Sequence, residues 1–295
     1  MRPFLQNIRK PEWIRTRMPS GEEYVGVRAI LKRYKLNTVC EDALCPNLSN
    51  CWGSGTVTIM ILGNICSRAC RFCAVRSGDP GGKIDLDEPR RVGLAVRELG
   101  LKYVVITSVT RDDLPDGGAS IYAETVREIK KNNRDVIVEI LIPDFNNSRE
   151  SIRTIVESGP EVIGHNIETV ERLTPLVRDP RAGYWKSLKT LKMVKEENPN
   201  IYTKSSLMLG LGETREEVIR TMRDLRNVGV DFLTLGQYLR PTKKHIPVVE
   251  YIAPETFNEY KKIGEELGFI YVASGPLVRS SYLAGEYYFR NIKIA

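Results

Sequence analysis

Apolar, β-branched runs alternate with amphipathic stretches through the middle of the chain. The amphipathic stretches predict helices near 87–99, 118–131, 148–158, 184–197 and 214–228. The runs between them have the length and composition of buried strands, at residues 56–63, 102–108, 135–143, 161–168, 202–209 and 231–237. Strands and helices that alternate with short links predict an α/β protein with a parallel sheet and helical crossovers. Six such units favour a partial (β/α)6 barrel, similar to a TIM barrel, over an open sheet.

The two ends of the chain depart from this alternation. Residues 1–55 predict an N-terminal arm with one helix near 22–35. Residues 56–245 then form the barrel. Residues 246–295 form a C-terminal extension with a helix at 254–267, an apolar segment (FIYVASGP) and a tail. We therefore expect three parts, with the barrel between two flanking segments.

Composition is that of a globular protein from a reducing compartment. Of the 295 residues, 42% are hydrophobic and 27% are charged, which is ordinary for a chain with a sizeable core. No apolar run approaches the ~20 residues of a membrane span, and the N-terminal segment lacks the apolar region of a secretory signal. We therefore expect a cytoplasmic protein that does not enter a membrane.

The chain is basic, with a net charge of +7. The simplest interpretation is a solvated surface with scattered Lys and Arg, although the same charge also favours acidic partners. No basic block is interleaved with aromatic residues, so we expect no nucleic-acid binding.

All six cysteines lie in one 34-residue stretch, in two sets of three. The sets are Cys40, Cys45 and Cys51 (C-x4-C-x5-C) and Cys66, Cys70 and Cys73 (C-x3-C-x2-C). An iron–sulfur cubane is usually held by four Cys, so three per set leave one iron open, and an open position is where a metal site does chemistry. The second set follows the first predicted strand. Catalytic groups of α/β barrels lie at the carboxyl ends of strands, so we expect this set at the barrel mouth.

Two other uses of six cysteines are less favoured. Three disulfides are unusual in a large enzyme of a reducing compartment. A zinc site usually has four ligands in paired knuckles, and the two histidines, His165 and His245, lie far away in sequence.

The C-x3-C-x2-C loop, with Phe72 before its last cysteine, resembles the signature of the radical S-adenosylmethionine (SAM) superfamily. The resemblance implies a [4Fe-4S] cluster whose open iron binds SAM, and cleavage of SAM to a 5′-deoxyadenosyl radical. The segments LPDGGAS, HNIET and TKSS are similar to cofactor-binding elements of that superfamily, although each also fits a structural role, such as a turn for the glycine pair. The residues implied in SAM binding are Phe72, Gly117, Gly118, Asn166, Glu168 and Lys204.

A longer series of segments resembles the lipoyl synthase family over nearly the whole chain. The segments are KPEWIRTRMP, TVCEDALCPNLSNCW, MILGNICSRACRFCAV, TSVTRDDLPDGGA, HNIETV, KSSLMLGLGET, QYLRPT and VRSSYLAGE. This resemblance implies that the first cysteine set holds an auxiliary [4Fe-4S] cluster, with a serine of the RSSY segment as its fourth ligand. We favour Ser281 over Ser280, although Ser281 also fits a helix N-cap and the sequence does not choose between the two serines.

The activity implied is the insertion of two sulfur atoms, donated by the auxiliary cluster, at carbons 6 and 8 of a protein-bound octanoyl-lysine. An unactivated C–H bond offers no charge for acid–base catalysis, so a radical is needed, and a carbon radical needs sulfur within ~3–3.5 Å. The partners implied are octanoylated lipoyl carrier domains (2-oxoacid dehydrogenase E2 and the glycine cleavage H protein), an electron donor such as ferredoxin or flavodoxin, and cluster-assembly proteins. Arg178 and Arg240 are candidates for binding the cofactor carboxylate or shaping the substrate tunnel, against the alternative of surface salt bridges.

Three competing interpretations remain at this point. Another radical SAM sulfur inserter, similar to biotin synthase, would be expected to carry its auxiliary cluster on barrel residues and not on an N-terminal arm. A two-cluster electron carrier would saturate each cluster with four Cys. A zinc-stabilised nucleic-acid-binding protein is suggested only by the basic charge and the cysteines.

Overall fold

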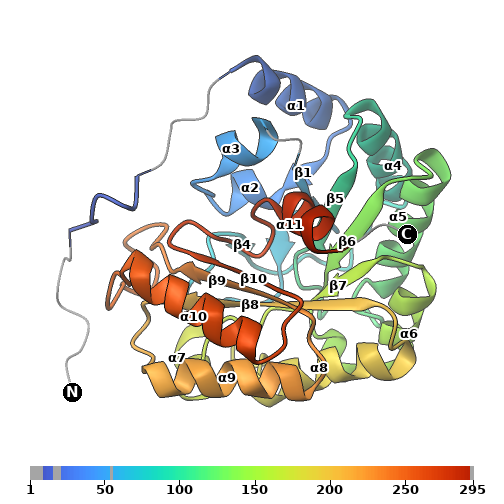
Figure 1. Cartoon of the computed structure of the whole chain (residues 1–295). Coiled ribbons are helices and arrows are strands. Elements are labelled where there is room, and N and C mark those ends of the chain that lie inside the picture. Colours follow the sequence, from blue (N-terminus) through green and yellow to red (C-terminus); the bar gives the residue numbers. More distant parts are fainter. Residues whose placement is uncertain (1–8, 16–20, 54–55, 293–295) are drawn as a thin grey trace.

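The centre of the molecule is a mostly parallel eight-stranded sheet, ordered β1-β2-β5-β6-β7-β8-β9-β10 (Figure 1). The computed structural model describes residues 9–15, 21–53 and 56–292; residues 1–8, 16–20 and 54–55 of the expected arm and 293–295 of the expected extension lie outside them. The strands of this sheet are β1 (Asn37–Thr38), β2 (Thr58–Ile61), β5 (Tyr103–Ser108), β6 (Ile137–Leu141), β7 (Val162–Gly164), β8 (Tyr202–Leu209), β9 (Phe232–Gln237) and β10 (Tyr271–Gly275).

Helices cover the outside of the sheet, in the alternation that the sequence predicts (Figure 1). Each of the six predicted strands is present, and the six pair in parallel with one another in sequence order, so the α/β fold with a partial barrel is confirmed. The helices are α1 (Glu22–Arg33), α2 (Val39–Asp42), α3 (Leu48–Gly53), α4 (Glu88–Glu98), α5 (Ala119–Asn132), α6 (Arg149–Glu157), α7 (Thr174–Val177), α8 (Tyr184–Glu197), α9 (Arg215–Asn227), α10 (Pro254–Glu266) and α11 (Ala284–Asn291), with short 3-10 turns at Phe145–Asn147 and Glu171–Leu173.

The flanking segments also enter the sheet. β1 of the arm pairs antiparallel with β2. The apolar segment of the extension forms β10, which pairs in parallel with β9 from Tyr271 opposite Phe232 onward. This seventh parallel strand is not among the six that the sequence predicts.

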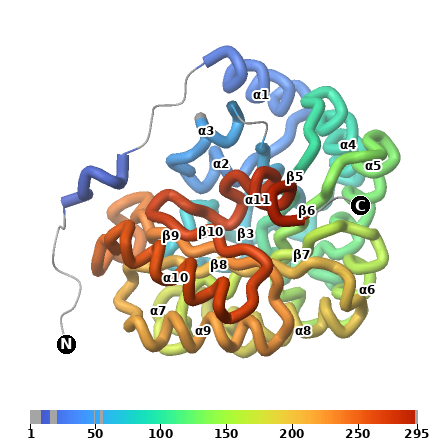
Figure 2. The backbone as a smooth tube through the Cα atoms, in the orientation of Figure 1, coloured from blue at the N-terminus to red at the C-terminus, as the bar shows by residue number. Residues whose placement is uncertain are grey.

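The barrel is open between its two edges, since β1 and β10 are not hydrogen-bonded to each other within the described ranges. The arm around α2 and α3 lies beside the segment that leads from β10 to α11 (Figure 2), and the Asn47 side-chain amide donates to Leu277 O at 2.5 Å. A Cβ on Gly236 of β9 would lie 1.9 Å from Val278 O. Only glycine therefore lets this C-terminal segment lie so close to the sheet.

An aromatic cluster closes the other end of the barrel. Tyr103, Phe232 and Tyr271 are the first residues of their strands, and Tyr288 of α11 packs among them. The Phe232 and Tyr271 rings stack at 4.3 Å between centroids. Access to the interior is therefore from the carboxyl ends of the strands. Within the described ranges, no helix is both long enough and apolar enough to cross a bilayer.

Candidate active site

A cavity of about 500 Å³ lies at the carboxyl ends of the strands. Its wall includes residues from the ends of β5, β6, β8 and β9, from the α2–α3 region and from the segment before α11. All six cysteines line it, together with Ser280 and Ser281. The structure therefore brings both cysteine sets and the RSSY segment to one chamber.

The second cysteine set lies on a loop closed at its base by two short strands. β3 (Ile65–Cys66) and β4 (Arg76–Ser77) pair in parallel, and Gly78 N donates to Cys66 O at 2.9 Å. Two thiol sulfurs accept backbone hydrogen bonds, Cys66 Sγ from Arg68 N at 3.4 Å and Cys70 Sγ from Asp179 N at 3.3 Å. The loop thus has a defined shape set by the protein chain.

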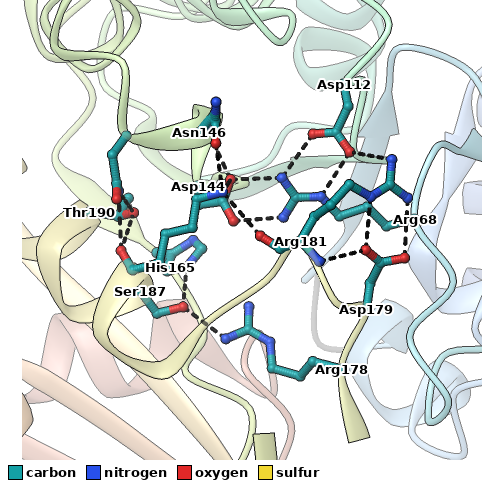
Figure 3. A network of polar contacts seen from close by, with 12 residues as sticks. Arg68, Asp112, Asp144, Asn146, His165, Arg178, Asp179, Arg181, Ser187 and Thr190 are labelled. Carbon is teal, nitrogen blue, oxygen red and sulfur yellow. Dashed lines mark hydrogen bonds and ion pairs between the residues drawn. The ribbon is translucent and has the colours of Figure 1, made fainter. Parts of the chain in front are cut away.

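Arg68, inside this loop, forms a buried ion-pair network with two neighbouring strand ends (Figure 3). Its Nε and Nη2 atoms donate to Asp112 at 2.9 and 2.8 Å, and Nη1 and Nη2 donate to Asp144 at 2.6 and 2.8 Å. Burial by itself would raise the pKa of Asp144, but the Arg68 guanidinium outweighs it and holds that pKa well below its usual range. Two bidentate contacts of this kind fix the loop against the loops that follow β5 and β6.

A second pair of charges continues the network (Figure 3). Asp179 accepts from Ala69 N at 2.9 Å and from Arg181 Nε at 2.9 Å. Arg181 also donates to Ser67 O at 2.5 Å and pairs with Asp112 at 3.1 Å. Sequence reasoning missed this network; the available signal was a cation inside C-x3-C and acidic residues just after two predicted strands.

The first cysteine set lies on the short helices of the arm. Cys40 belongs to α2 and Cys51 to α3, and Cys45 N donates to Cys40 O at 3.0 Å in the turn between them. Burial raises the pKa of Cys40 to about 11 and that of Cys51 to about 12. Burial likewise raises the pKa of Cys73 to about 12. Without metal these thiols are neutral, and a bound metal would displace their protons.

The RSSY segment reaches the same cavity from the opposite end of the chain. Arg279 anchors it through Nη1, which donates to Gln237 O at 2.7 Å. Ser281 is not a helix N-cap, because α11 begins after Leu283, which is the cap residue and has left-handed backbone angles. The alternative interpretation of Ser281 as a helix N-cap is therefore wrong.

Three of the predicted SAM-binding residues line the cavity: Phe72, Asn166 and Glu168. Glu168 has left-handed backbone angles (φ 68°), held by hydrogen bonds to β8 from its N to Ser206 O and from Met208 N to its O. Its carboxylate accepts from the Asn166 amide at 3.2 Å. Burial raises the pKa of Glu168, with Arg178 and Asn166 acting against that rise.

The other three, Gly117, Gly118 and Lys204, are not among the residues that line the cavity. A Cβ on Gly118 would lie 2.3 Å from Leu62 Cδ1, and one on Gly117 would lie 2.8 Å from Phe145 Cδ1. These glycines therefore permit close packing at the start of α5. Lys204 Nζ donates to both carboxylate oxygens of Glu139 at 2.9 Å, deep in the barrel. The β8 residues that do reach the wall are Ser206, Leu207 and Met208.

Neither candidate arginine forms a surface salt bridge. Arg178 is buried, and its Nη1 donates to Ser187 Oγ at 2.8 Å and Ile167 O at 3.3 Å, while its Nε has no hydrogen-bond partner. Arg240 donates to His245 O at 2.8 Å and also lines the cavity. Both positions suit a cavity role.

His165 is buried beside Arg178, and its surroundings keep it neutral. Its Nδ1 lies 2.9 Å from Ile142 O and its Nε2 lies 2.9 Å from Ser187 Oγ. Because a carbonyl only accepts, the ring proton belongs on Nδ1 and Ser187 donates to Nε2. Burial, with the Arg178 charge, lowers the pKa of His165 to about 4.

The donor chemistry of this cavity fits iron–sulfur clusters. No disulfide joins any of the six cysteines, and soft thiolates are the ligands that such clusters use. Within residues 9–15, 21–53 and 56–292, no three His, Cys, Asp or Glu side chains converge on one point as ligands of a single metal ion do. A cubane distributes its thiolates over separate irons, so its ligands need not converge on one point.

The fold and the three-cysteine loop are those of a radical SAM protein, and the model of the radical SAM superfamily matches residues 60–225. The fold is shared with Streptococcus suis SuiB, solved with its precursor peptide SuiA, at a TM-score of 0.58 and 13% identity, over 99% of this chain and 62% of that one. Radical SAM proteins use a [4Fe-4S] cluster and SAM.

A second model, the N-terminal domain of lipoyl synthase, matches residues 2–45. Lipoyl synthase of Thermus thermophilus is 56% identical over 96% of this chain and 88% of its own length. Lipoyl synthase of Francisella tularensis subsp. novicida is 53% identical over 97% of this chain and 87% of its own. The chain belongs to the lipoyl synthase family. The sequence-based interpretation as a sulfur-inserting radical SAM enzyme is confirmed.

Proposed function

We propose that the cavity holds two [4Fe-4S] clusters, one on each cysteine set. The observation that carries the proposal is that two sets of three cysteines line one chamber, in a chain that has no further cysteine. The first cluster would be held by Cys66, Cys70 and Cys73, and the second by Cys40, Cys45, Cys51 and Ser281. Two observations support Ser281 as a ligand of the second cluster. It lines the cavity, and it does not cap helix α11.

SAM would lie beside the first set, at the ends of β7 and β8. Asn166 and Glu168 would bind the ribose hydroxyls, since both carry polar atoms at the wall and backbone hydrogen bonds hold Glu168 in place. Arg178 supplies a buried positive charge with an unpartnered Nε, which suits the carboxylate of SAM. Gly117, Gly118 and Lys204 are left out of this assignment because they do not reach the wall.

When bound, the clusters and SAM supply the radical that removes hydrogen from an unactivated carbon and the sulfur that replaces it. The chain brings the two thiol sets to the wall of one cavity, so a single acyl chain can meet both. Ser281 provides a hydroxyl oxygen, a harder ligand than thiolate, which makes its iron the easiest to release. The aromatic cluster and α11 close the barrel behind the site and limit water access from that end.

The substrate that we propose is an octanoyl chain on a lysine of a lipoyl carrier domain, converted at carbons 6 and 8. The cavity is open toward the strand ends, where a lysine-linked chain can enter while the carrier stays outside. Carriers of the 2-oxoacid dehydrogenase E2 and glycine cleavage H types, a ferredoxin or flavodoxin donor and cluster-assembly proteins are the partners that this function needs.

The experiment is anaerobic incubation with SAM, a reductant and an octanoyl-lysyl peptide, read by mass spectrometry, with iron content measured on the same samples. Reconstituted parent protein should carry about eight irons per chain and form the lipoyl peptide. Cys70→Ala should abolish SAM cleavage. Cys45→Ala should still release 5′-deoxyadenosine but insert no sulfur. Lipoyl product from Cys45→Ala, or four irons in the parent, would refute the two-cluster assignment.

A further inference from the structure

Trp52 is a fully buried side chain next to the first cysteine set. It follows Cys51 in α3, is only 1% exposed, and is the largest of the fully buried side chains. Its ring stacks on Tyr24 of α1, with 5.2 Å between centroids and 22° between planes. Packing therefore fixes the indole in one orientation against the arm.

The indole N–H of Trp52 has no hydrogen-bond partner of good geometry among the described residues. Buried indole N–H groups usually find an acceptor, because leaving one unpaired is costly. The group it lies against is the Cys40 thiol, whose pKa this donor lowers while burial raises it. A neutral thiol is a weak acceptor, so among the described residues the indole N–H has no strong acceptor.

The indole of Trp185 allows a comparison. Trp185 is exposed on α8, and its indole N–H donates to Glu171 at 2.6 Å. The exposed indole thus has a carboxylate partner, whereas the buried Trp52 N–H has only the neighbouring Cys40 sulfur beside it among the described residues. The Trp52 N–H is therefore placed to donate to a sulfur of this cysteine set.

We propose that the Trp52 N–H donates a hydrogen bond to sulfur of the iron–sulfur group held by Cys40, Cys45 and Cys51, which makes Trp52 a positioning residue that tunes this group. The inference rests on the proposed function, since it requires the second cluster. A metal-bound thiolate or sulfide carries more negative charge than a thiol and is the stronger acceptor. In a buried, low-dielectric site such a bond is strengthened and favours the more negative, reduced form.

The Trp52 indole differs in kind from the backbone donors to the cysteines. The second set accepts backbone N–H groups of Arg68 and Asp179, which substitution does not remove. The first set also accepts backbone N–H groups, of Thr58 at Cys40 and of Leu283 at Cys51, but the Trp52 indole is a side-chain donor, which substitution does remove. This difference makes the role of Trp52 testable in a direct way.

The test is Trp52→Phe, which keeps an aromatic ring on Tyr24 and removes the N–H together with the smaller ring of the indole. It is made in full-length chain that also carries Cys66→Ala, Cys70→Ala and Cys73→Ala, so that only the second cluster is present. The matched control is Trp185→Phe in the same background. The midpoint potential of the cluster is followed by electron paramagnetic resonance during reductive titration.

Trp52→Phe should lower the equilibrium constant for reduction about tenfold, which is about 59 mV more negative for a one-electron couple. Trp185→Phe should titrate at the parent potential. Equal potentials for Trp52→Phe and its parent would overturn the inference. Absence of any cluster in the parent background would instead refute the proposed function, so the two failures are distinguishable.

A second measurement avoids substitution altogether. Protein labelled with indole-15N tryptophan is reduced, and pulsed electron paramagnetic resonance records 15N coupling to the second cluster. Coupling is expected from Trp52 alone, since it is the tryptophan next to this cysteine set. Absence of 15N coupling would overturn the inference even if Trp52→Phe misfolded.

Discussion

Replacing Asp144 by Asn should destabilise the folded chain, because it removes one carboxylate from the Arg68 network. The Asp144 side chain is 1% exposed and that of Arg68 is 6% exposed. Their two contacts are 2.6 and 2.8 Å long. Asn has nearly the same shape, but its amide group turns a donor toward the guanidinium and leaves Asp112 as the nearest anion. Asp112 is 25% exposed, so it compensates the buried charge only in part.

The magnitude follows from the cost of breaking a buried ion pair, which is about 3–5 kcal/mol. Because Asp112 remains, we expect a value of about 3 kcal/mol. With an unfolding entropy of about 2.1 cal/mol/K per residue, each kcal/mol lowers the melting temperature of a 295-residue chain by roughly 1.6 °C, so the shift should be about 5 °C. Thermal unfolding of the metal-free protein measures it under anaerobic conditions.

The matched control is Asp87→Asn, which removes the same charge from an exposed pair. Asp87 lies 2.7 Å from Arg90, but the two side chains are 52% and 58% exposed, so the loss should stay below about 1 kcal/mol. Equal melting temperatures for Asp144→Asn and Asp87→Asn would refute the reasoning.

Acid should remove the difference between Asp144→Asn and its parent. The folded-state pKa of Asp144 is depressed, so the stability from this pair is present above the unfolded value near 3.9 and is lost as pH falls below it. The gap in melting temperature should therefore be constant near neutral pH and shrink below about pH 4. A gap that widened in acid would contradict the ion-pair explanation.

Three further predictions concern other parts of the molecule. Ser281→Cys should retain the second cluster but slow sulfur transfer, and Ser281→Ala should lower lipoyl product more than Ser280→Ala does; iron content and mass spectrometry check this, and the reverse order for the alanine variants would refute the choice of Ser281. The buried His165 has a pKa of about 4 against about 6.5 unfolded, so it should cost roughly 2 kcal/mol of stability between pH 7 and pH 5, a loss absent in His165→Asn. Raising salt to ~0.15 M shortens the Debye length to ~8 Å and should weaken capture of a whole carrier domain more than of a neutral octanoyl-lysyl peptide, and equal sensitivity would remove the case for charge-guided docking.

The sequence by itself determined the local features of this protein. Hydrophobic periodicity located the six predicted strands and the helices between them. The residues that form the buried face of a strand or helix lie close together in sequence, so their spacing can be read along the chain. Ligand spacing identified the loop of Cys66, Cys70 and Cys73, because a cluster loop is built from residues close in sequence. The apolar segment that forms β10 was visible, but its pairing with β9 was not, since strand pairing depends on the rest of the sheet.

The tertiary structure decided which side chains share a site. Lys204 fits a cofactor role by its sequence context, yet the barrel places it opposite Glu139, and charges so deeply buried pair with each other. Arg68 and Asp144 are far apart in sequence and meet because the parallel strands β2, β5 and β6 end at the same edge of the sheet. Trp52 stacks on Tyr24, and its buried indole N–H has no hydrogen-bond partner among the described residues, which only the folded chain shows. Such contacts depend on long-range register, which no local pattern along the chain encodes.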